Sequence, residues 1–294
     1  MISIILTGYK EQRTIGRAIE QILDNKIKGK YEILVLAPDN ETLEAARVYS
    51  TKNDKIKVIG DKGKGKPAAL NLAFSKSKGD ILVLTDADVF IAENAISNIL
   101  KPFKNPKIGA VSGHPLSTND KKTMLGFWSH LLVDIAHRIR QERYAKNQMI
   151  VCSGYLYAFR KKLIKNIPED VFSEDAVISH LIAEKGYGIA YAGDALVFVK
   201  YPLNFKDWII QKRRSAGGYN QLKYLIKTKE RMRSFAKESA GIFKVLSYPK
   251  TIKQFFYTVI LVLARIYLWI LIYVDINLKK KEFKKIWKRV ESTK

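Results

Sequence analysis

The chain has 294 residues, 47% of them hydrophobic, which excludes an intrinsically disordered protein and allows one large domain or two small ones. The formal net charge of +24 is extreme and indicates an anionic partner, such as nucleic acid, an acidic membrane surface or a phosphorylated substrate. The single cysteine, Cys152, excludes an internal disulfide framework and is typical of a reducing compartment. No signal peptide is expected, because Met1 leads directly into an apolar run without a basic region.

The first 110 residues alternate between short apolar runs and helical patterns. Between the first two runs, Ile15, Ala18 and Ile19 fall on one helical face, and Thr14 before them is placed as the N-cap. A further helix begins at Pro67. This βαβ rhythm predicts an α/β fold with a mostly parallel sheet that helices cover on both faces. The predicted strands are 2–6, 32–36, 56–59, 81–84 and 108–111.

The middle of the chain is less regular. A helical pattern covers 125–141, and a strand-like run follows at 155–159. Another helix begins near Glu174, a strand follows at 188–191, and a further helix is expected after Pro202.

The C-terminal region changes character. The run 255–274 has Arg265 as its only charge and is long enough to cross a bilayer core, although a buried core helix has the same composition. The preceding stretch, 234–253, mixes apolar residues with lysines, as interfacial amphipathic helices do. We therefore predict a catalytic domain over 1–230 and a membrane-associated region over 231–294.

The basic tail at 279–289 bears on membrane topology. With a cytoplasmic catalytic domain, a single span would place this tail outside, against the positive-inside rule. A re-entrant or in-plane segment would keep both ends on the anionic cytoplasmic leaflet, and it is favoured for that reason. The predicted location is the cytoplasmic face of the cell membrane.

Asp86 and Asp88 follow the buried run 81–84 directly. Taken alone, this pair fits either a turn with a helix cap or a metal site. Carboxylate oxygens suit a hard cation such as Mg²⁺ or Mn²⁺, and such a cation can hold a diphosphate. Ligand sites in open α/β sheets lie beyond the carboxyl ends of strands, where both residues are expected.

Other polar residues follow the neighbouring strands. Tyr9 is placed to stack on a base, and Glu11 to accept a hydrogen bond from it. Asp39 suits a helix N-cap as well as a contact with a nucleoside. Lys66 ends a basic loop rich in glycine, which fits a loop near phosphates as well as a solvated lysine loop. Together with Asp86 and Asp88, these residues predict one nucleotide-diphosphate site along one sheet edge.

Two motifs later in the chain add candidate catalytic groups. In 173–175, Glu174 and Asp175 fit the acidic first turn of a helix, and Asp175 also fits a general base for an acceptor hydroxyl. In 211–214, Arg214 fits a bidentate clamp on a diphosphate or part of a basic, membrane-facing helix.

With these motifs in order, residues 1–225 resemble the processive, membrane-associated branch of family 2 glycosyltransferases, which includes cellulose, chitin and hyaluronan synthases. The resemblance implies a glycosyltransferase A-type fold, a nucleotide-sugar donor (UDP-sugar favoured) and inverting transfer by a single displacement. Its marks are Thr7-Gly8-Tyr9-Lys10-Glu11, Asp39, Gly65-Lys66-Pro67-Ala68-Ala69-Leu70-Asn71, Asp86-Ala87-Asp88, Ser173-Glu174-Asp175 and Gln211-Lys212-Arg213-Arg214.

The resemblance also implies roles for the matched residues. A divalent cation would bind Asp88 together with Asp86. Asp175 and Glu174 would serve catalysis. Gln211 and Arg214 would serve the acceptor side and the diphosphate. The residues implied in donor binding are Thr7, Tyr9, Glu11, Asp39, Lys66, Asp86, Gln211 and Arg214.

One departure from the family pattern affects the expected product. Ser215 stands where the family's Gln-x-x-Arg-Trp pattern has the Trp that normally stacks on the acceptor sugar. A single C-terminal apolar run also does not build a multi-helix export channel from one copy. The expected activity is therefore transfer of a sugar to a lipid-linked or glycan acceptor, with oligomers left open. A processive synthase subunit acting with partners is the alternative.

Two further alternatives belong to other classes. A sugar nucleotidyltransferase can share this sheet and uses metal, but it does not need the motifs at 173–175 and 211–214. A nucleic-acid-binding protein would account for the net charge. Much of that charge lies after residue 200 beside apolar sequence, which lipid attraction explains better, so no nucleic acid is expected as a partner.

Overall fold

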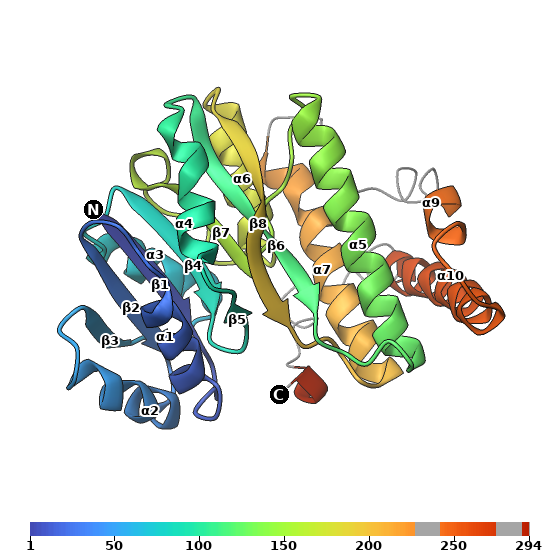
Figure 1. Ribbon diagram of the computed structural model, residues 1–294, viewed down its shortest axis with the longest axis horizontal. Helices are drawn as coiled ribbons and strands as arrows, with labels where there is room; N and C mark the ends of the chain where they lie inside the picture. Colours follow the sequence, from blue (N-terminus) through green and yellow to red (C-terminus); the bar gives the residue numbers. More distant parts are fainter. Residues whose placement is uncertain (227–241, 275–289, 294) are drawn as a thin grey trace. The chain divides into compact units, whose positions relative to one another are not determined.

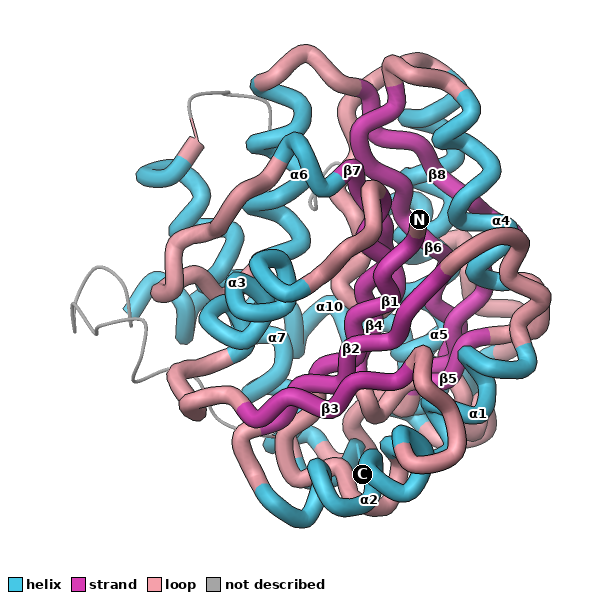
Figure 2. The backbone as a smooth tube through the Cα atoms, turned by 90° about the vertical axis from the view of Figure 1, so that its left-hand side faces the viewer, coloured by secondary structure: helices cyan, strands magenta, loops and turns pink. Residues whose placement is uncertain are grey.

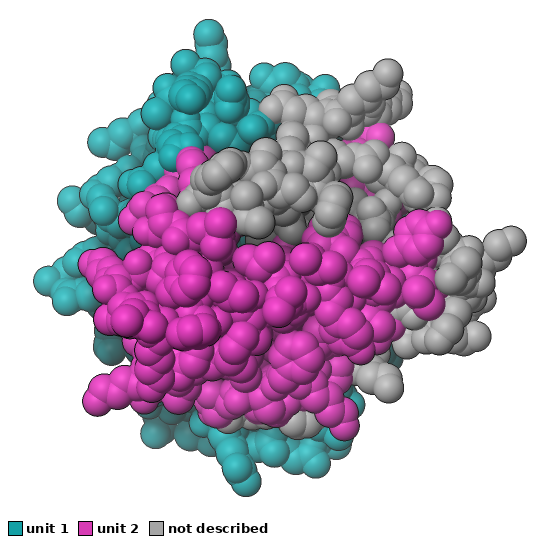
Figure 3. Space-filling model, turned by 90° about the vertical axis from the view of Figure 1, so that its right-hand side faces the viewer, with its two compact units in different colours: residues 1–115, 141–199 teal, residues 116–140, 200–294 magenta. Residues whose placement is uncertain are grey.

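The computed structural model describes residues 1–226, 242–274 and 290–293. The predicted amphipathic stretch therefore lies in part, and the basic tail wholly, outside the described residues. The chain forms two compact units, coloured separately in Figure 3. The first comprises Met1–Pro115 and Gln141–Val199, and the second Leu116–Arg140 and Lys200–Lys294. The division into a catalytic and a membrane-associated region at residue 230 stays a prediction.

A sheet of eight strands, counted over the described residues, forms the centre of the first unit (Figure 1). The strand order is β3-β2-β1-β4-β7-β6-β8-β5. The strands are β1 (Ile2–Thr7), β2 (Tyr31–Ala37), β3 (Ile56–Gly60), β4 (Ile81–Asp86), β5 (Phe90–Ile91), β6 (Ile108–Ser117), β7 (Leu156–Arg160) and β8 (Gly188–Val199).

The two halves of the sheet differ in direction. Strands β3, β2, β1 and β4 pair in parallel, as the βαβ rhythm predicts. Strand β7 then enters antiparallel between β4 and β6, and β5 pairs antiparallel with β8. The α/β prediction is confirmed, but the antiparallel insertion was not predicted, because a short apolar run does not reveal its direction. Strand β8 is also far longer than the predicted 188–191.

Helices cover both faces of this sheet. Figure 2 shows α1 and α4 on one side of the strands and α3 and α6 on the other. Each helix turns an apolar face inward, and the central strands are buried from both sides: Ile4, Leu34 and Val83 have no exposed surface. The helices are α1 (Ile15–Asp24), α2 (Asn40–Ser50), α3 (Lys66–Lys76), α4 (Ala95–Leu100) and α6 (Glu174–Glu184).

The starts of two helices test the predicted caps. Thr14 is the N-cap residue of α1 as predicted, but its hydroxyl makes no cap hydrogen bond and donates to the carboxylate of Glu11 at 3.0 Å instead. Asp39 does cap α2, since its carboxylate accepts from the backbone amide of Thr42 at 3.0 Å. The same carboxylate ties down the first loop by accepting from the amide of Lys10 at 2.8 Å.

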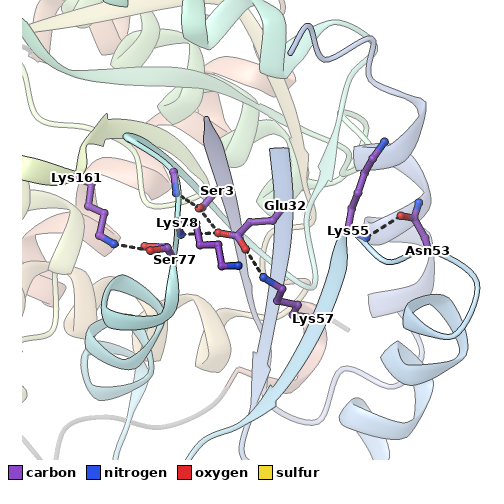
Figure 4. A network of polar contacts seen from close by, with 9 residues as sticks. Ser3, Glu32, Asn53, Lys55, Lys57, Ser77, Lys78 and Lys161 are labelled. Carbon is purple, nitrogen blue, oxygen red and sulfur yellow. Dashed lines mark hydrogen bonds and ion pairs between the residues drawn. The ribbon is translucent and has the colours of Figure 1, made fainter. Parts of the chain in front are cut away.

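The amino-end edge of the sheet holds a buried carboxylate (Figure 4). Glu32, only 2% exposed, accepts from the hydroxyl of Ser3 at 2.7 Å and from the amide of Lys78 at 2.6 Å. It also pairs with the ammonium of Lys57 at 2.7 Å. Burial alone would raise the pKa of Glu32, but these donors hold it below its ordinary value. This network ties together the starts of β1, β2, β3 and β4.

The second unit is helical in its described residues. It holds most of α5 (Met124–Ala145), together with α7 (Phe205–Leu225), α9 (Ile242–Leu246) and α10 (Ile252–Tyr273). These helices share one apolar core, in which Trp128 and Trp208 meet edge to face with ring centres 5.3 Å apart. The helices predicted near 125–141 and after Pro202 are thereby confirmed, and the apolar run 255–274 lies mainly in α10.

Candidate active site

The carboxyl ends of β1 and β4 carry the first part of the site. The two strands are parallel and in register, so their last residues, Thr7 and Asp86, lie opposite each other. The hydroxyl of Thr7 donates to Asp86 Oδ1 at 3.1 Å. Thr7, which only the family resemblance had named, thus lies beside the first aspartate of the predicted pair.

Lys66 joins this edge to a distant segment of the chain. Its ammonium lies 2.7 Å from Asp86 Oδ1 and 2.7 Å from Glu174 Oε1. Burial would lower the pKa of Lys66, but the two carboxylates raise it above its ordinary value, so the side chain stays charged. One positive charge thus bridges the start of α3, the end of β4 and the start of α6.

The carboxylates around this bridge also act on one another. Burial raises the pKa of Asp86, Lys66 opposes that rise, and the charges of Asp88 and Glu174 add to it. Asp88 lies in the turn between β4 and β5. Three carboxylates act on one another through a partly buried space, which is an environment that attracts a further cation.

Asp175 is the fourth acidic group of the cluster. Its carboxylate accepts from the backbone amide of Ala176 at 2.8 Å and from that of Gly154. Burial raises its pKa to about 6, and the charge of Glu174 adds to the rise. A carboxyl group with such a pKa is a competent base at neutral pH. Gly154 leaves room for it, since a Cβ there would lie 3.3 Å from Asp175 Oδ2.

Tyr157 on β7 belongs to the same cluster and was not predicted. It has no exposed surface, and its hydroxyl has no hydrogen-bond partner among the described residues. Burial raises its pKa well above the ordinary value, and the charges of Glu174 and Asp175 add to this effect. A strand residue opposite Leu84 of β4 carries no local signal of this placement. Only the pairing of β7 with β4 reveals it.

The loop after β1 carries the residues expected to meet the nucleoside. Tyr9 is 42% exposed, and the ammonium of Lys10 lies 5.5 Å from the centre of its ring. Glu11 is 5% exposed, and its amide donates to the hydroxyl of Thr42 at 2.8 Å. Because Asp39 also holds this loop, Tyr9, Glu11 and Asp39 form one connected group beside the carboxyl ends of β1 and β2.

Gln211 and Arg214 lie on α7 in the second unit. Oε1 of Gln211 is buried without a hydrogen-bond partner among the described residues. A buried, unsatisfied amide oxygen is costly, and such groups occur where a ligand supplies the partner. The roles predicted for these two residues stay predictions.

The donor set at the first unit's sheet edge fits a divalent cation. Asp86 and Asp88 offer hard oxygen ligands, and their mutual repulsion with Glu174 favours added positive charge. No group of three or more His, Cys, Asp or Glu side chains in the described residues is arranged to hold a metal by itself. Such a cation would therefore complete its coordination with water or with the oxygens of a bound diphosphate.

The fold is shared with a solved structure. It is similar to "Mannosyltransferase PcManGT from Pyrobaculum calidifontis in complex with GDP-Man and Mn2+", with a TM-score of 0.63 and 20% identity. The match covers 97% of this chain and 82% of that one. The predicted glycosyltransferase A-type α/β fold is thereby confirmed.

The family follows from sequence. The model described as "Glycosyltransferase like family 2" matches residues 1–218, so the chain belongs to glycosyltransferase family 2 and is a glycosyltransferase. It is 27% identical over 229 residues to the poly-beta-1,6-N-acetyl-D-glucosamine synthases of Staphylococcus aureus (strain COL) and Staphylococcus epidermidis (strain ATCC 35984). These matches cover 75% of this chain and 55% of each relative. The chain thus spans about half the length of the curated relatives it matches.

Proposed function

We propose that the chain is a metal-dependent, inverting glycosyltransferase that takes a sugar from a nucleotide-diphosphate donor, with UDP-sugar favoured. The acceptor is a lipid-linked or polysaccharide glycan at the cytoplasmic face of the membrane. The observation that carries this proposal is the cluster of Lys66, Asp86, Glu174 and Asp175 at the carboxyl edge of the sheet in a family 2 chain. The solved relative with GDP-Man and Mn²⁺ and the synthases named above are compatible with it.

The donor is assigned to the loops after the parallel strands. Tyr9 offers its exposed ring to the base, while Glu11 and Asp39 hold that loop in place. Mg²⁺ or Mn²⁺ is assigned to Asp88 with Asp86, and when bound it neutralises charge on the departing diphosphate. Gln211 and Arg214 are assigned to the acceptor side and to the diphosphate on the motif alone.

Asp175 is assigned the base role because of its pKa of about 6. The acceptor hydroxyl gives its proton to the Asp175 carboxylate while its oxygen forms a bond to the anomeric carbon. The bond from that carbon to the diphosphate oxygen breaks, and the nucleoside diphosphate leaves with the electron pair. A single displacement of this kind inverts the anomeric configuration. Glu174, held by Lys66, keeps the start of α6 and hence Asp175 in position.

The test is a panel of nucleotide sugars with Mn²⁺ or Mg²⁺ and a membrane extract as acceptor, read by release of nucleoside diphosphate. We expect release with one donor and loss of release in Asp88→Ala. The exposed Asp54 offers a matched control, and Asp54→Ala should behave as wild type. Release of pyrophosphate would indicate a nucleotidyltransferase and overturn the proposal, as would full activity of Asp88→Ala.

A processive synthase subunit is the second candidate, favoured by the names of the curated relatives. Ser215, in place of the stacking Trp of the family pattern, counts against it. The size of the product separates the two, because single transfer adds one sugar per acceptor whereas a synthase makes a ladder or a polymer.

A further inference from the structure

Helix α10 has two apolar faces with different surroundings. Thr258, Leu261, Ala264, Leu268 and Ile272, spaced by three and four residues, lie on one face and are buried. They share a core with Phe127, Trp128 and Leu131 of α5 and with Trp208 of α7. The opposite face is exposed and mainly apolar: Leu263 is 60% exposed and Ile270 55%. Phe255, Phe256, Val259 and Ile266 continue this exposed face.

By length and composition, α10 is the one helix of the described residues that could cross a membrane. Its 22 residues extend for about 33 Å, close to the thickness of a bilayer core. A crossing helix, however, would place its two ends on opposite sides of the bilayer.

Both ends of α10 lead instead to contacts with the same unit. Before the helix, the hydroxyl of Tyr248 donates to the carboxylate of Asp134 on α5 at 2.5 Å. After it, the amide of Ser292 donates to the carboxylate of Asp207 on α7 at 3.0 Å, and the amide of Leu203 donates to Ser292 Oγ at 3.1 Å. Neither connection is compatible with a bilayer between the two ends of the helix.

The partners of the buried face also argue against a crossing. Along its inner face α10 packs on α5 and α7, which carry Asp134, Arg138 and Lys212 within their length. If α10 spanned the bilayer, α5 and α7 would have to enter it as well, because they pack along α10. Their charged side chains would then lie in hydrocarbon, at a cost of about 2.5–3.5 kcal/mol for each charge at the centre of a span.

We propose that α10 is a monotopic anchor, which lies in the plane of an anionic membrane with its exposed face in the lipid and its inner face on α5 and α7. Lipid is the occupant that the charge distribution fits. Lys250 and Lys253 precede the apolar face, and the sequence after it carries the basic tail 279–289, so positive charge flanks it on both sides. This inference deepens the proposed membrane location and does not depend on the proposed reaction.

Depth measurements on spin-labelled full-length chain test the orientation. In a Cys152→Ala background, the label is placed in turn at Phe255→Cys, Leu263→Cys and Ile270→Cys, and the protein is bound to vesicles of phosphatidylglycerol and phosphatidylcholine. We expect three similar, shallow depths below the phosphate level. A maximum depth at Leu263, near the bilayer centre, would show a spanning helix and overturn the proposal.

Sidedness gives a second reading on the same vesicles. Single cysteines at Val48→Cys and Lys294→Cys should both react with a membrane-impermeant maleimide added outside sealed vesicles. Protection of only one of them contradicts the in-plane orientation.

Flotation of Leu263→Glu with the vesicles should fall at least tenfold, while Val48→Glu, which changes a similarly exposed apolar residue of the first unit, floats as wild type. If the wild-type chain does not float with the vesicles but forms dimers in solution, a second copy of the chain covers the exposed face of α10, and the proposed lipid contact is refuted.

Lys66 carries a second inference by an independent observation. Its ammonium lies 2.7 Å from both Asp86 and Glu174, at the centre of the carboxylates that fit a divalent cation. We infer that Lys66 is a built-in counter-cation, which weakens metal binding until the donor brings its own negative charge. This inference rests on the proposed metal site. It implies that the metal ion and the donor bind together.

Mn²⁺ binding followed by electron paramagnetic resonance tests this without any turnover. In the absence of donor, Lys66→Met should bind Mn²⁺ about tenfold more tightly than wild type, because a competing positive charge is gone. Lys66→Arg should resemble wild type, and so should Lys62→Met in the exposed part of the same loop. Weaker or unchanged binding in Lys66→Met would refute the inference. No Mn²⁺ binding by any variant, with or without a nucleotide diphosphate, would instead refute the metal site itself.

Discussion

At the amino ends of β1 and β2, the carboxylate of Glu32 is buried among donors that satisfy it: a hydroxyl, a backbone amide and an ammonium. At the carboxyl ends of the parallel strands, Asp86 and Asp175 are half-buried and stand beside further carboxylates. The pKa of Glu32 is lowered, whereas the pKa values of Asp86 and Asp175 are raised. One sheet thus buries acidic groups at both edges with opposite electrostatic results.

The difference separates a group that stabilises the fold from groups held ready for chemistry. A carboxylate whose donors are all present lowers the free energy of the folded state. Carboxylates that repel one another raise it, and such an arrangement is typical of sites where a ligand or metal supplies the missing charge. The comparison predicts that changes at the amino-end edge affect stability alone, and that changes at the carboxyl-end edge affect activity first.

The largest expected effect is on activity. Asp175→Asn keeps the shape of the side chain but removes the proposed base, so we expect transfer to fall by about 10²–10⁴-fold. The free energy of unfolding should stay equal or rise, because a charge crowded by Glu174 is lost. The measurement is nucleoside diphosphate release alongside thermal unfolding. Retained activity would mean that another group accepts the proton. The contrast between Glu32 at the amino ends of the strands and Asp175 at their carboxyl ends would then be wrong.

The next effect is on stability. Glu32→Ala leaves the amide of Lys78 and the hydroxyl of Ser3 without their buried acceptor, which should lower the free energy of unfolding by about 1–3 kcal/mol. Activity per folded molecule should be unchanged, because Glu32 lies at the edge away from the site. Glu44→Ala removes an exposed glutamate that pairs with Arg47, and should change stability by no more than about 0.5 kcal/mol. If the two variants lose equal free energy of unfolding, the buried network around Glu32 contributes no more to stability than an exposed ion pair.

A smaller effect is expected at Gly154. A Cβ at this position would lie 3.3 Å from Asp175 Oδ2, closer than most side-chain contacts, so the carboxylate must shift by a few tenths of an ångström. Misplacing a reacting group on this scale should lower kcat by about tenfold in Gly154→Ala. Gly186→Ala, where a Cβ meets nothing within 4 Å, changes a glycine of positive φ and should lower stability instead. If Gly154→Ala instead raises KM and leaves kcat unchanged, Gly154 does not help to position Asp175.

The sequence predicts the parts of this site that are local. Apolar runs that end in polar residues locate Asp39 and Asp86 at the carboxyl ends of parallel strands, whereas Thr7 was named only by the family resemblance. Asp39 shows the limit of such reading, since it caps α2 and ties the loop at Lys10 as well. A single pattern gives the position of a carboxylate, and only the structure gives all the donors that surround it.

Interactions between distant segments were beyond the sequence patterns. Lys66, Asp86 and Glu174 come from three elements, and no spacing in the chain predicts that one ammonium bridges two carboxylates. Tyr157 was missed for a related reason: its strand joins the sheet antiparallel to β4, and that direction decides what its hydroxyl faces. Thr14 occupies the predicted N-cap position, but the nearby carboxylate of Glu11 takes its hydroxyl, which the sequence pattern did not reveal.

The smallest effect, and the sharpest comparison of the two edges, comes from pH. The pKa of Asp175, about 6, lies above its unfolded value, so this proposed base is protonated as pH falls through 6 and kcat should halve there. Protonation of this crowded group also makes folding slightly more favourable over the same range. Glu32 has the opposite sign: its lowered pKa gives a stabilisation that is complete above its unfolded pKa and is lost as pH falls below it. Activity should therefore fall between pH 7 and 5 while the melting temperature holds or rises, and stability should fall only in more acidic solution. A melting temperature that drops together with kcat near pH 6 would show that both edges respond to the same titration and that the contrast between them is wrong.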